Sequence, residues 1–244
     1  MPDIKIEDLS YSYKKNKTKI LALDKINIEF ETNKIHVILG KSGGGKTTLL
    51  KCICGLYEYE GHIYFDDIAI DNTSIKEREI GLVSQNFSLY PHFDLFTSIS
   101  FPLKTMGLSP SEIKKRVYEV ANIFKIENIL SRKPKQVSLG QAQRAAIARA
   151  IVKRPQVCLF DESFCNIDEE TKAEIRLYLK KALHEFGSTT IFVTHDLKEA
   201  TSFGDYIYLL NDGKIIEKGT VNDILYSNNP EVKEFFDTLK NETL

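Results

Sequence analysis

The sequence predicts an α/β fold with a buried sheet at its centre. Three short runs rich in apolar and β-branched residues, at 35–39, 157–160 and 189–193, have the composition of strands that are covered on both faces. Segments with helical periodicity separate these runs along the chain, as an α/β fold requires. A glycine-rich octapeptide at 40–47 follows the first run directly and leads into a helical segment, so it forms a tight strand-to-helix connection.

The octapeptide has the residue types of a phosphate-binding loop, Gly40-Lys41-Ser42-Gly43-Gly44-Gly45-Lys46-Thr47. Glycines allow the backbone to curl until its N–H groups point inward, and the following helix adds the positive end of its dipole. Lys46 would then reach the β- and γ-phosphates, and Thr47 would offer its hydroxyl to Mg²⁺. The alternative, a flexible glycine-rich loop with an unrelated lysine, is disfavoured by the strand before it and the helix after it.

Length and composition limit the class of protein. The chain has 244 residues, 42% of them apolar, which suits one large α/β domain or two small ones. A net charge of −1 gives no reason to expect a nucleic-acid partner. Because no apolar run reaches the length of a membrane span and the N-terminus lacks the apolar core of a signal peptide, we expect a soluble, cytoplasmic chain.

The four cysteines are Cys52, Cys54, Cys158 and Cys165. Their spacing matches neither a disulfide framework nor a zinc site. Small buried hydrophobic residues are therefore a better interpretation of them than metal ligands.

The first thirty residues predict antiparallel strands, because apolar residues alternate with polar ones around Ile4 and Ile6 and again around Ile26 and Ile28. Tyr13 lies just before the lysine-rich connection between these strands. Its ring could pack on a neighbouring strand or offer a flat surface to a nucleotide base. The local pattern alone favours packing.

Capping and turn signals place further elements. Ser109, Pro110 and Glu112 have the order of a helix start, and apolar residues then recur at helical spacing through 113–124. Asn211-Asp212-Gly213 between two apolar runs predicts a β-hairpin turn. We find no internal repeat or linker, so one domain is expected.

Polar residues follow the second and third apolar runs directly. Asp161 and Glu162 come after the second run, and two carboxylates at the end of a buried strand are costly unless they serve a cation or a reaction. In a protein with a phosphate loop, the aspartate that organises magnesium belongs there. His195 follows the third run, at the edge where open α/β sheets bind ligands.

The segment Val137-Ser138-Leu139-Gly140-Gln141-Ala142-Gln143-Arg144 resembles the signature motif of ATP-binding-cassette (ABC) ATPases. The other motifs of that family stand in the family's order: the phosphate loop, a glutamine loop at Gln85, the signature, a strand ending in Asp161-Glu162, an Asn166-Ile167-Asp168 loop and His195. The resemblance covers essentially the whole chain. The ordered set is far more specific than any one of its members.

This resemblance implies a P-loop NTPase (RecA-like) core with an N-terminal antiparallel β subdomain and an inserted helical signature subdomain at about residues 90–153. It also implies that residues 1–244 form a single ABC ATPase domain. Many sugar-type members continue into a C-terminal regulatory β domain. We expect none here, because the chain stops soon after Phe236.

The resemblance also assigns roles to individual residues, with ATP and Mg²⁺ as the implied ligands. The nucleotide-binding residues are Tyr13, Gly40, Lys41, Ser42, Gly43, Gly44, Gly45, Lys46, Thr47 and Thr48. Tyr13 would stack on adenine, which reverses the preference from local pattern. The catalytic residues are Glu162, His195, Lys46 and Gln85, with Glu162 as the general base and His195 at the γ-phosphate. Thr47, Gln85 and Asp161 would hold Mg²⁺.

Members of this family work as head-to-tail pairs, in which ATP lies between the phosphate loop of one copy and the signature of the other. Ser138, Leu139, Gly140 and Gln141 would thus act in trans, at the N-terminus of the helix they open. Asp168 belongs to the family's D-loop. The second ATPase subunit is either an identical chain or a related one.

Two residues depart from the family's pattern. Leu139 stands where glycine is usual in the signature, and Ser163 stands where proline usually follows the Asp-Glu pair. A leucine adds bulk close to the partner's nucleotide, which would slow closure or hydrolysis. Because Ser138, Gly140 and Gln141 are retained, we predict an active but slow ATPase.

Within the family, the region from Gln85 through Tyr90-Pro91-His92-Phe93 to Ile99-Ser100-Phe101-Pro102-Leu103 resembles the importer ATPases for sugars and polyamines. There it forms the groove that receives a coupling helix of a membrane subunit. The implied partners are integral membrane permease subunits and an extracytoplasmic solute-binding protein. The chain would then be peripheral on the inner face of the cell membrane. Alternatively, these aromatic residues only pack the helical lobe.

Two other classes of protein are alternatives to a transporter subunit. The first is a soluble ABC ATPase that acts on a protein assembly, ribosome or DNA without a membrane partner, and neither a long coiled coil nor a second cassette supports it. The second is a small-molecule kinase or GTPase built on the same loop. It would explain neither the signature nor His195.

Overall fold

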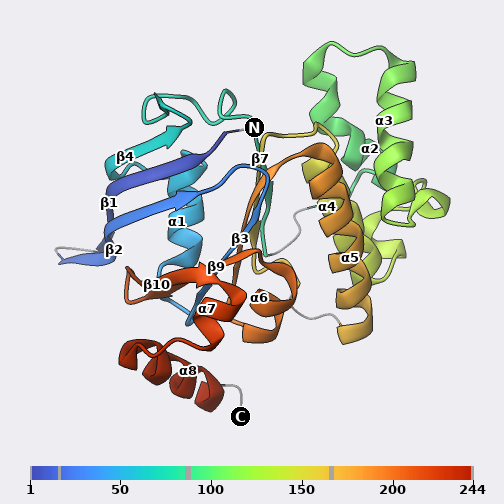
Figure 1. Ribbon diagram of the computed structural model, residues 1–244. Coiled ribbons are helices and arrows are strands. Elements are labelled where there is room, and N and C mark those ends of the chain that lie inside the picture. Colours follow the sequence, from blue (N-terminus) through green and yellow to red (C-terminus); the bar gives the residue numbers. More distant parts are fainter. Residues whose placement is uncertain (1, 16–17, 86–88, 165–167, 243–244) are drawn as a thin grey trace. The chain divides into compact units, whose positions relative to one another are not determined.

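The structure of the protein is a computed structural model, which describes residues 2–15, 18–85, 89–164 and 168–242 (Figure 1). The chain divides into two compact units. The first consists of residues 1–80 and 189–244, and the second of residues 81–188. The second unit is thus an insertion in the sequence of the first.

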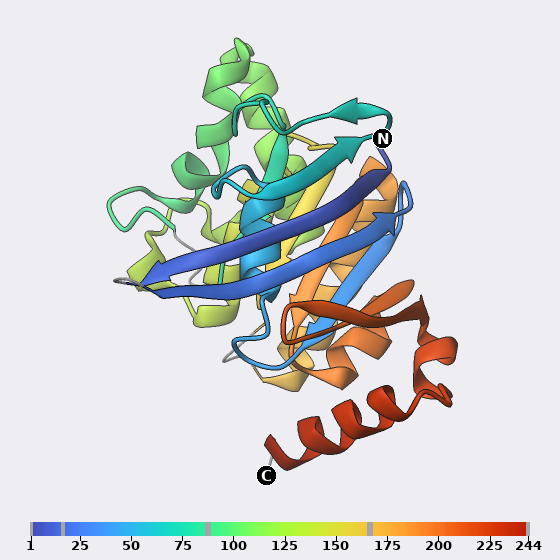
Figure 2. The ribbon, with the colours of Figure 1, turned by 90° about the vertical axis from the view of Figure 1, so that its left-hand side faces the viewer.

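An antiparallel sheet begins the first unit. Its strand order is β2 (Thr18–Phe30), β1 (Ile4–Lys15), β4 (Glu60–Phe65) and β5 (Ile68–Ala69), and the long β1 and β2 run side by side in Figure 2. The register pairs Ile4 with Phe30 and Ile6 with Ile28, and all four side chains are buried. Alternation therefore turns one face of the sheet to the core. The predicted antiparallel strands are confirmed.

A second, mainly parallel sheet carries the glycine-rich loop. Within the first unit its order is β10 (Lys214–Thr220), β9 (Tyr206–Asn211), β3 (Ile35–Gly40) and β8 (Thr189–Thr194). β3 pairs in parallel with both β8 and β9, and all six of its residues are buried. This position inside the sheet explains why the sequence of β3 is apolar without alternation.

A tight turn and short helices connect the strands of the first unit. β9 returns into β10 through Asp212 and Gly213, whose φ angles are 45° and 75°, as a two-residue type I′ turn requires. The hairpin predicted there is confirmed. The helices described in this unit are α1 (Lys46–Ile53), α6 (Leu197–Phe203), α7 (Val221–Leu225) and α8 (Pro230–Glu242).

The second unit is mainly helical and contains two neighbouring strands of a sheet, β6 (Ile80–Val83) and β7 (Val157–Asp161). Its α-helices are α2 (Leu95–Ser100), α3 (Pro110–Ile123), α4 (Leu139–Ile151) and α5 (Glu169–Phe186). Short 3-10 helices, η1 (Phe101–Met106), η2 (Glu127–Ile129) and η3 (Pro134–Gln136), connect them. α4 packs on α2 and α3, and its Ala145, Ala146 and Ala148 are buried in the core.

Side-chain caps begin the helices of the second unit. The Ser109 hydroxyl accepts a hydrogen bond from the Glu112 amide at 3.2 Å, and Pro110 occupies the first helical position of α3. Asp94 caps α2 by accepting from the Thr97 amide at 2.7 Å. Such caps satisfy amide groups that lack a partner inside the helix. The helix start predicted at Ser109 is confirmed.

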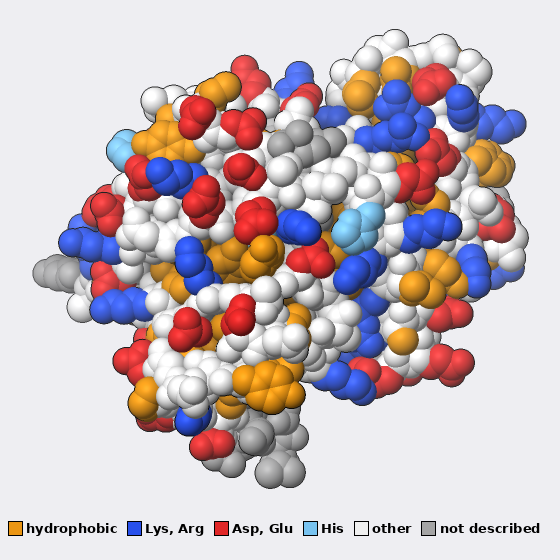
Figure 3. Space-filling model, viewed as in Figure 1, with side chains coloured by type: hydrophobic (Ala, Val, Ile, Leu, Met, Phe, Trp, Pro, Cys, Tyr) orange, Lys and Arg blue, Asp and Glu red, His pale blue; other side chains and the backbone are white. Residues whose placement is uncertain are grey.

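The surface carries charges of both signs. Lysine and arginine side chains are interspersed with aspartate and glutamate on the face shown in Figure 3, as a net charge of −1 leads one to expect. Within the described ranges, no helix combines the length and the apolar character that crossing a lipid bilayer requires.

His36 is a titratable group buried in β3. Its ring stacks on Tyr206 at 5.6 Å and packs edge-on against Phe30 at 5.2 Å. Nε2 lies 2.8 Å from the carbonyl oxygen of Glu31, and Nδ1 lies 3.2 Å from the hydroxyl of Tyr208. Burial lowers the pKa of His36 below its ordinary value, although the bond to Glu31 favours the charged form.

Acid should therefore destabilise the fold through His36. The unfolded chain takes up this proton near pH 6.5 and the folded chain only at lower pH. The contribution of His36 to the free energy of unfolding is fully present above about pH 6.5 and falls below it, by up to about 1.4 kcal/mol per pH unit. Urea unfolding at about pH 7.5 and about pH 5.5 should show a smaller acid loss for His36→Gln than for the wild type.

The matched control is His184→Gln, at an exposed histidine on α5, which should leave the acid loss unchanged. An equal acid loss in His36→Gln and in the wild type would show that His36 does not drive it.

Candidate functional site

The glycine-rich loop connects β3 to α1. Gly43 and Gly45 have φ angles of 79° and 102°. Residues with a Cβ rarely adopt this backbone region. A Cβ at Gly45 would also lie 2.6 Å from the carbonyl oxygen of Ala22. Gly45 is the N-cap of α1 and supplies no side-chain cap. The first amides of α1 therefore face the loop without a competing side chain, as in a phosphate site.

The side chain of Lys46 is folded into this loop. Its ammonium donates hydrogen bonds of 2.9 Å to the carbonyls of Gly40 and Lys41, and the residue is only 4% exposed. An ammonium buried at a helix N-terminus creates a strongly positive environment. The loop is thus built to attract an anion. Thr47 is half-buried and Thr48 buried beside it in α1.

Tyr13 joins the antiparallel sheet to α1. Its hydroxyl lies 2.8 Å from the Thr48 hydroxyl. Its ring packs edge-on against Tyr11 and Tyr57, which stack on each other at 4.8 Å, yet Tyr13 remains 37% exposed. The ring therefore packs on neighbouring residues, as the local pattern predicts. Stacking of its exposed surface on a nucleotide base stays a prediction.

His195 lies at the same edge of the sheet as the loop. It follows Thr194, the last residue of β8, which pairs with Leu39 immediately before Gly40. His195 is exposed. Asp196 then caps α6 by accepting from the Lys198 amide at 2.7 Å. The parallel register therefore places His195 and the loop at the carboxyl ends of adjacent strands.

The second unit brings Gln85 and Glu162 together. The Gln85 side-chain amide donates to the Glu162 carboxylate at 3.3 Å. Asp161 ends β7, and Glu162 directly after it has a φ of 43°, in the left-handed region that few non-glycine residues adopt. Backbone outliers of this kind gather at functional sites. The two carboxylates thus lie where a strand leaves the sheet.

Ser163, one of the two departures from the family's pattern, has a structural role. Its side chain is buried, and its hydroxyl donates to the carbonyl of Val83 at 3.3 Å. Val83 ends β6, two residues before Gln85. A proline at this position would have no side-chain donor. Ser163 therefore adds a bond between the end of β7 and the end of β6.

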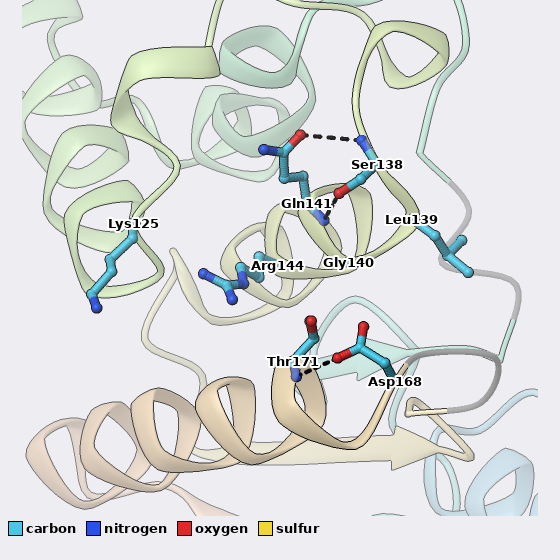
Figure 4. A pocket seen from close by; sticks show the side chains of 8 residues that line it. All are labelled: Lys125, Ser138, Leu139, Gly140, Gln141, Arg144, Asp168 and Thr171. Carbon is cyan, nitrogen blue, oxygen red and sulfur yellow. Dashed lines mark hydrogen bonds between the residues drawn. The ribbon is translucent and has the colours of Figure 1, made fainter.

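The signature residues open α4 in a capping box. The Ser138 hydroxyl accepts from the Gln141 amide at 3.2 Å, and the Gln141 side chain accepts from the Ser138 amide at 3.1 Å (Figure 4). The order Ser-x-x-Gln is the sequence signal for this box, and we missed it. The box leaves the helix start preorganised, with Leu139 half exposed.

A cavity of about 390 Å³ lies in front of this helix start. Its lining combines the signature with residues of α5 and of the loop after α3: Lys125, Ser138, Leu139, Gly140, Gln141, Arg144, Asp168 and Thr171. Asp168 accepts from the Thr171 amide at 2.8 Å and so caps α5. This bond lowers the pKa of Asp168. Asn166 and Ile167 of the expected D-loop lie outside the described residues.

Two cations of this cavity were missed as site residues. Arg144 pairs with Glu174 at 2.6 Å, and Lys125 lies 4.8 Å from the centre of the Tyr178 ring. Arg144 is the last residue of the signature segment 137–144. Its position in that segment was the signal by which it could have been found. Lys125 has no local signal, because only the packing of α3, α4 and α5 brings it to the cavity.

Exposed aromatic rings gather in the second unit after Gln85. Tyr90, Phe93 and Phe101 form what we call the aromatic patch, with ring centroids 5.3–6.4 Å apart and each ring at least 38% exposed. Arg149 of α4 lies 5.8 Å from the centre of the Tyr90 ring. Residues 86–88, between Gln85 and the patch, lie outside the described residues. Exposed aromatic clusters of this kind mark interaction sites.

The residues proposed for Mg²⁺ suit that ion chemically. Thr47 in the first unit and Gln85 and Asp161 in the second offer hydroxyl, amide and carboxylate oxygens, the hard donors that Mg²⁺ prefers. Among the described residues there is no group of three His, Cys, Asp or Glu that could hold a metal by itself.

The described cysteines behave as small buried hydrophobic residues. Cys52, Cys54 and Cys158 are buried, and burial raises the pKa of Cys52 and of Cys158 to about 12. Thiols that stay protonated are poor metal ligands. The interpretation from the sequence is confirmed for these three, and Cys165 lies outside the described residues.

The close approach of α4 and α5 explains which signature glycine is retained. A Cβ at Gly140 would lie 2.9 Å from the Cγ2 methyl of Thr171. Leu139 points away from this contact (Figure 4). The chain therefore tolerates a side chain at 139, whereas a side chain at 140 would force the Thr171 methyl to move.

We expect Gly140→Ala to lower the free energy of unfolding by about 1–3 kcal/mol through this overlap, although alanine is the better helix former. In a Thr171→Ser background, which removes the methyl and keeps the hydroxyl, the same substitution should cost less than about 0.5 kcal/mol. Urea unfolding of the four proteins measures this coupling. Equal losses in the two backgrounds would contradict the contact.

Known proteins with similar sequences support this description. A family model described as ABC transporter matches residues 23–165. The sn-glycerol-3-phosphate import ATP-binding protein UgpC of Psychromonas ingrahamii is 37% identical over 204 residues, which are 83% of this chain and 55% of that protein. The chain therefore spans about half the length of this curated relative.

Solved structures confirm the fold class. A dimeric, post-hydrolysis structure of the ATP-binding cassette MJ0796 with ADP and Pi superposes with a TM-score of 0.82 at 32% identity, covering 89% of this chain and 98% of that one. The structure of cbiO1 from Clostridium perfringens, part of the ABC transporter complex cbiONQ, gives 0.83 at 27% identity, covering 96% and 98%. The predicted P-loop NTPase core, with its antiparallel β subdomain and helical signature region, is confirmed. Since the family model covers more than half of the sequence, the chain belongs to the ABC transporter family and is one of its ATPase cassettes.

Proposed function

We propose that this chain hydrolyses ATP to power the import of a solute across a membrane, by closing head-to-tail on a second ATPase subunit and reopening after hydrolysis. Residues 1–244 act as a single ATPase domain in this proposal. The observation that carries it is the buried ammonium of Lys46 inside a loop of left-handed glycines at the N-terminus of α1. The ordered motifs in both units then assign this anion site to a nucleotide.

Residues of the first unit would form the phosphate- and base-binding part of the nucleotide site. Gly40 to Thr48 would cradle the phosphates through backbone amides and the Lys46 ammonium. The exposed face of Tyr13 would stack on the adenine ring. His195, at the edge of the neighbouring strand, would contact the γ-phosphate. The existing hydroxyl contact between Tyr13 and Thr48 supports a shared site, because it already holds the ring beside α1.

Hydrolysis would use residues of both units. Glu162 is the general base that takes a proton from the attacking water, and Gln85 orients it through the existing 3.3 Å bond. Thr47, Gln85 and Asp161 would hold Mg²⁺, which when bound neutralises charge developing on the phosphates. Lys46 stabilises the same charge. Catalysis is then mainly positioning and electrostatics.

The cavity in front of α4 would receive the nucleotide of a second subunit. Ser138, Gly140 and Gln141 present the start of α4, where the helix dipole favours an anion. Asp168 lines the same cavity from α5. The dimeric cassette structures of MJ0796 support such a pair. Leu139 projects its bulk at this surface and would slow closure.

Two substitutions test the chemistry separately. Glu162→Gln removes the base but keeps the shape, so ATP turnover should fall by at least about 100-fold while ATP binding persists. The exposed Glu170→Gln on α5 is the matched control and should keep wild-type turnover. Leu139→Gly should raise turnover, because it removes bulk from the closing surface. Steady-state phosphate release and equilibrium ATP binding measure both effects.

Unchanged turnover in Leu139→Gly, together with loss of turnover in Glu162→Gln, would remove Leu139 as the limit on the cycle. Unchanged turnover in Glu162→Gln would exclude Glu162 as the base.

The import direction rests on the relative and on the aromatic patch. UgpC is by name an import ATP-binding protein, and the patch follows Gln85 in sequence, where the importer ATPases receive a coupling helix. Three exposed rings with Arg149 beside them suit an apolar helix end. Integral membrane permease subunits and a solute-binding protein would complete the transporter, with this chain peripheral on the inner face of the cell membrane.

Purification of the tagged chain from its own cells in mild detergent tests the membrane partnership. We expect integral membrane subunits to come with it, and Tyr90→Ala with Phe93→Ala to lose them because the docking surface is removed. Tyr226→Ala, at a ring 80% exposed in the first unit, should keep them. Recovery of the wild type alone or only with soluble assemblies, with ATPase activity indifferent to membranes, would refute transport and favour an ABC ATPase that acts on a soluble assembly.

A further inference from the structure

Arg78 is a buried cation that none of the roles above uses. It is only 5% exposed, and its guanidinium donates to four main-chain carbonyls. Nη1 donates to Cys52 at 3.1 Å and to Ile53 at 2.8 Å, Nη2 to Ile70 at 2.9 Å and Nε to Thr73 at 3.1 Å. A desolvated charge is costly unless its donors are satisfied. Four carbonyl bonds satisfy most of this guanidinium.

Two of these carbonyls belong to the last turn of α1. Cys52 and Ile53 end the helix that begins at the phosphate loop, and their carbonyls carry the negative end of its dipole. Arg78 therefore fixes the far end of the helix whose near end would hold the phosphates. The planar fork of a guanidinium can reach several carbonyls at once, which a lysine ammonium cannot do in the same geometry.

The chain around Arg78 is shaped to admit it. Gly55, just after α1, has a φ of 76°, and a Cβ there would lie 2.8 Å from both Cζ and Nε of Arg78. The other two bonds, to Ile70 and Thr73, hold the loop that precedes Arg78. The Arg78 amide also donates to the carbonyl of Ser74 at 3.1 Å. Both the backbone and the side chain of Arg78 are thus anchored in the first unit.

Arg78 also lies two residues before β6, where the chain enters the second unit. The division between the units falls after Ile80, within β6, and Gln85 follows two residues after that strand ends. Only Glu79, with a φ of 50°, separates Arg78 from β6, and a regular strand is a stiff connection. A displacement of α1 would therefore be carried through Arg78 into β6 and on to Gln85.

We propose that Arg78 is a positioning residue that couples the phosphate-loop helix to the glutamine loop, so that nucleotide binding at α1 shifts the segment 79–85. This inference rests on the proposed function, because it requires nucleotide binding at the loop. Arg78 itself touches neither nucleotide nor water in this scheme. It acts by holding the end of α1 and the loop before β6 together.

Hydrogen exchange of the full chain, with and without saturating Mg²⁺ and AMP-PNP, tests the coupling. In the wild type, nucleotide should slow exchange in residues 46–53 and in 79–85 over the same range of nucleotide concentration. In Arg78→Lys, nucleotide should still slow exchange in 46–53, while the response in 79–85 is lost. Arg116→Lys, at a surface arginine paired with Glu112 on α3, is the matched control and should respond as the wild type does.

A retained response of 79–85 in Arg78→Lys would overturn the inference. If that variant does not fold, Gly55→Ala takes its place, since its added methyl displaces the guanidinium and keeps the charge. The wild type by itself also tests the coupling. If nucleotide slows hydrogen exchange in 46–53 but not in 79–85, the coupling is overturned. Absence of protection at 46–53 in the wild type would instead refute nucleotide binding, and with it both proposals.

Discussion

The burial of β3 between β8 and β9 is the constraint on which the rest of the site depends. A strand paired on both sides and covered on both faces cannot shift its register without exposing apolar residues. Its end at Gly40 is therefore fixed in space, and so is the start of the loop. A Cβ at Gly40 would lie 2.6 Å from the carbonyl oxygen of Leu210 on β9, so the absence of a side chain lets the loop curl closely past this strand. The buried Lys46 ammonium follows from that curl.

Helix termini supply the second layer of the site, and they are prepared in three different ways. α1 begins with a glycine cap that brings no side chain, so its amides remain available to a ligand. α4 begins with the reciprocal Ser138–Gln141 box, which holds the helix start rigid while leaving its surface open. α5 begins with Asp168, whose carboxylate is engaged by Thr171. The physical difference lies in the first amides of each helix. In α4 and α5 a side chain accepts a hydrogen bond from one of them, whereas in α1 no side chain does and they remain available to an anion.

Buried polar groups connect elements where the apolar core cannot specify geometry. The Ser163 hydroxyl bonds the end of β7 to the end of β6, and Arg78 bonds the end of α1 to the loop before β6. Each group has a directional partner, because a desolvated donor left unpaired would be costly. Such bonds fix the ends of strands and helices, and Gln85 and Glu162, the side chains proposed for hydrolysis, follow the ends of β6 and β7.

Local signals in the sequence determined the elements and the loop. Apolar runs without alternation indicated β3, β7 and β8, the order Ser109-Pro110 indicated the start of α3, and the glycine-rich octapeptide lay where the structure has a strand-to-helix loop. These features depend on the backbone conformation and the burial of a few neighbouring residues. The types of those residues therefore predict them directly. The tertiary structure alone decided which distant groups meet. Lys125 reaches the signature cavity, Glu162 takes a left-handed backbone beside Gln85, and Gly140 is required by the methyl of Thr171. Such contacts join residues far apart in the sequence through the packing of whole helices, and no local pattern records that packing.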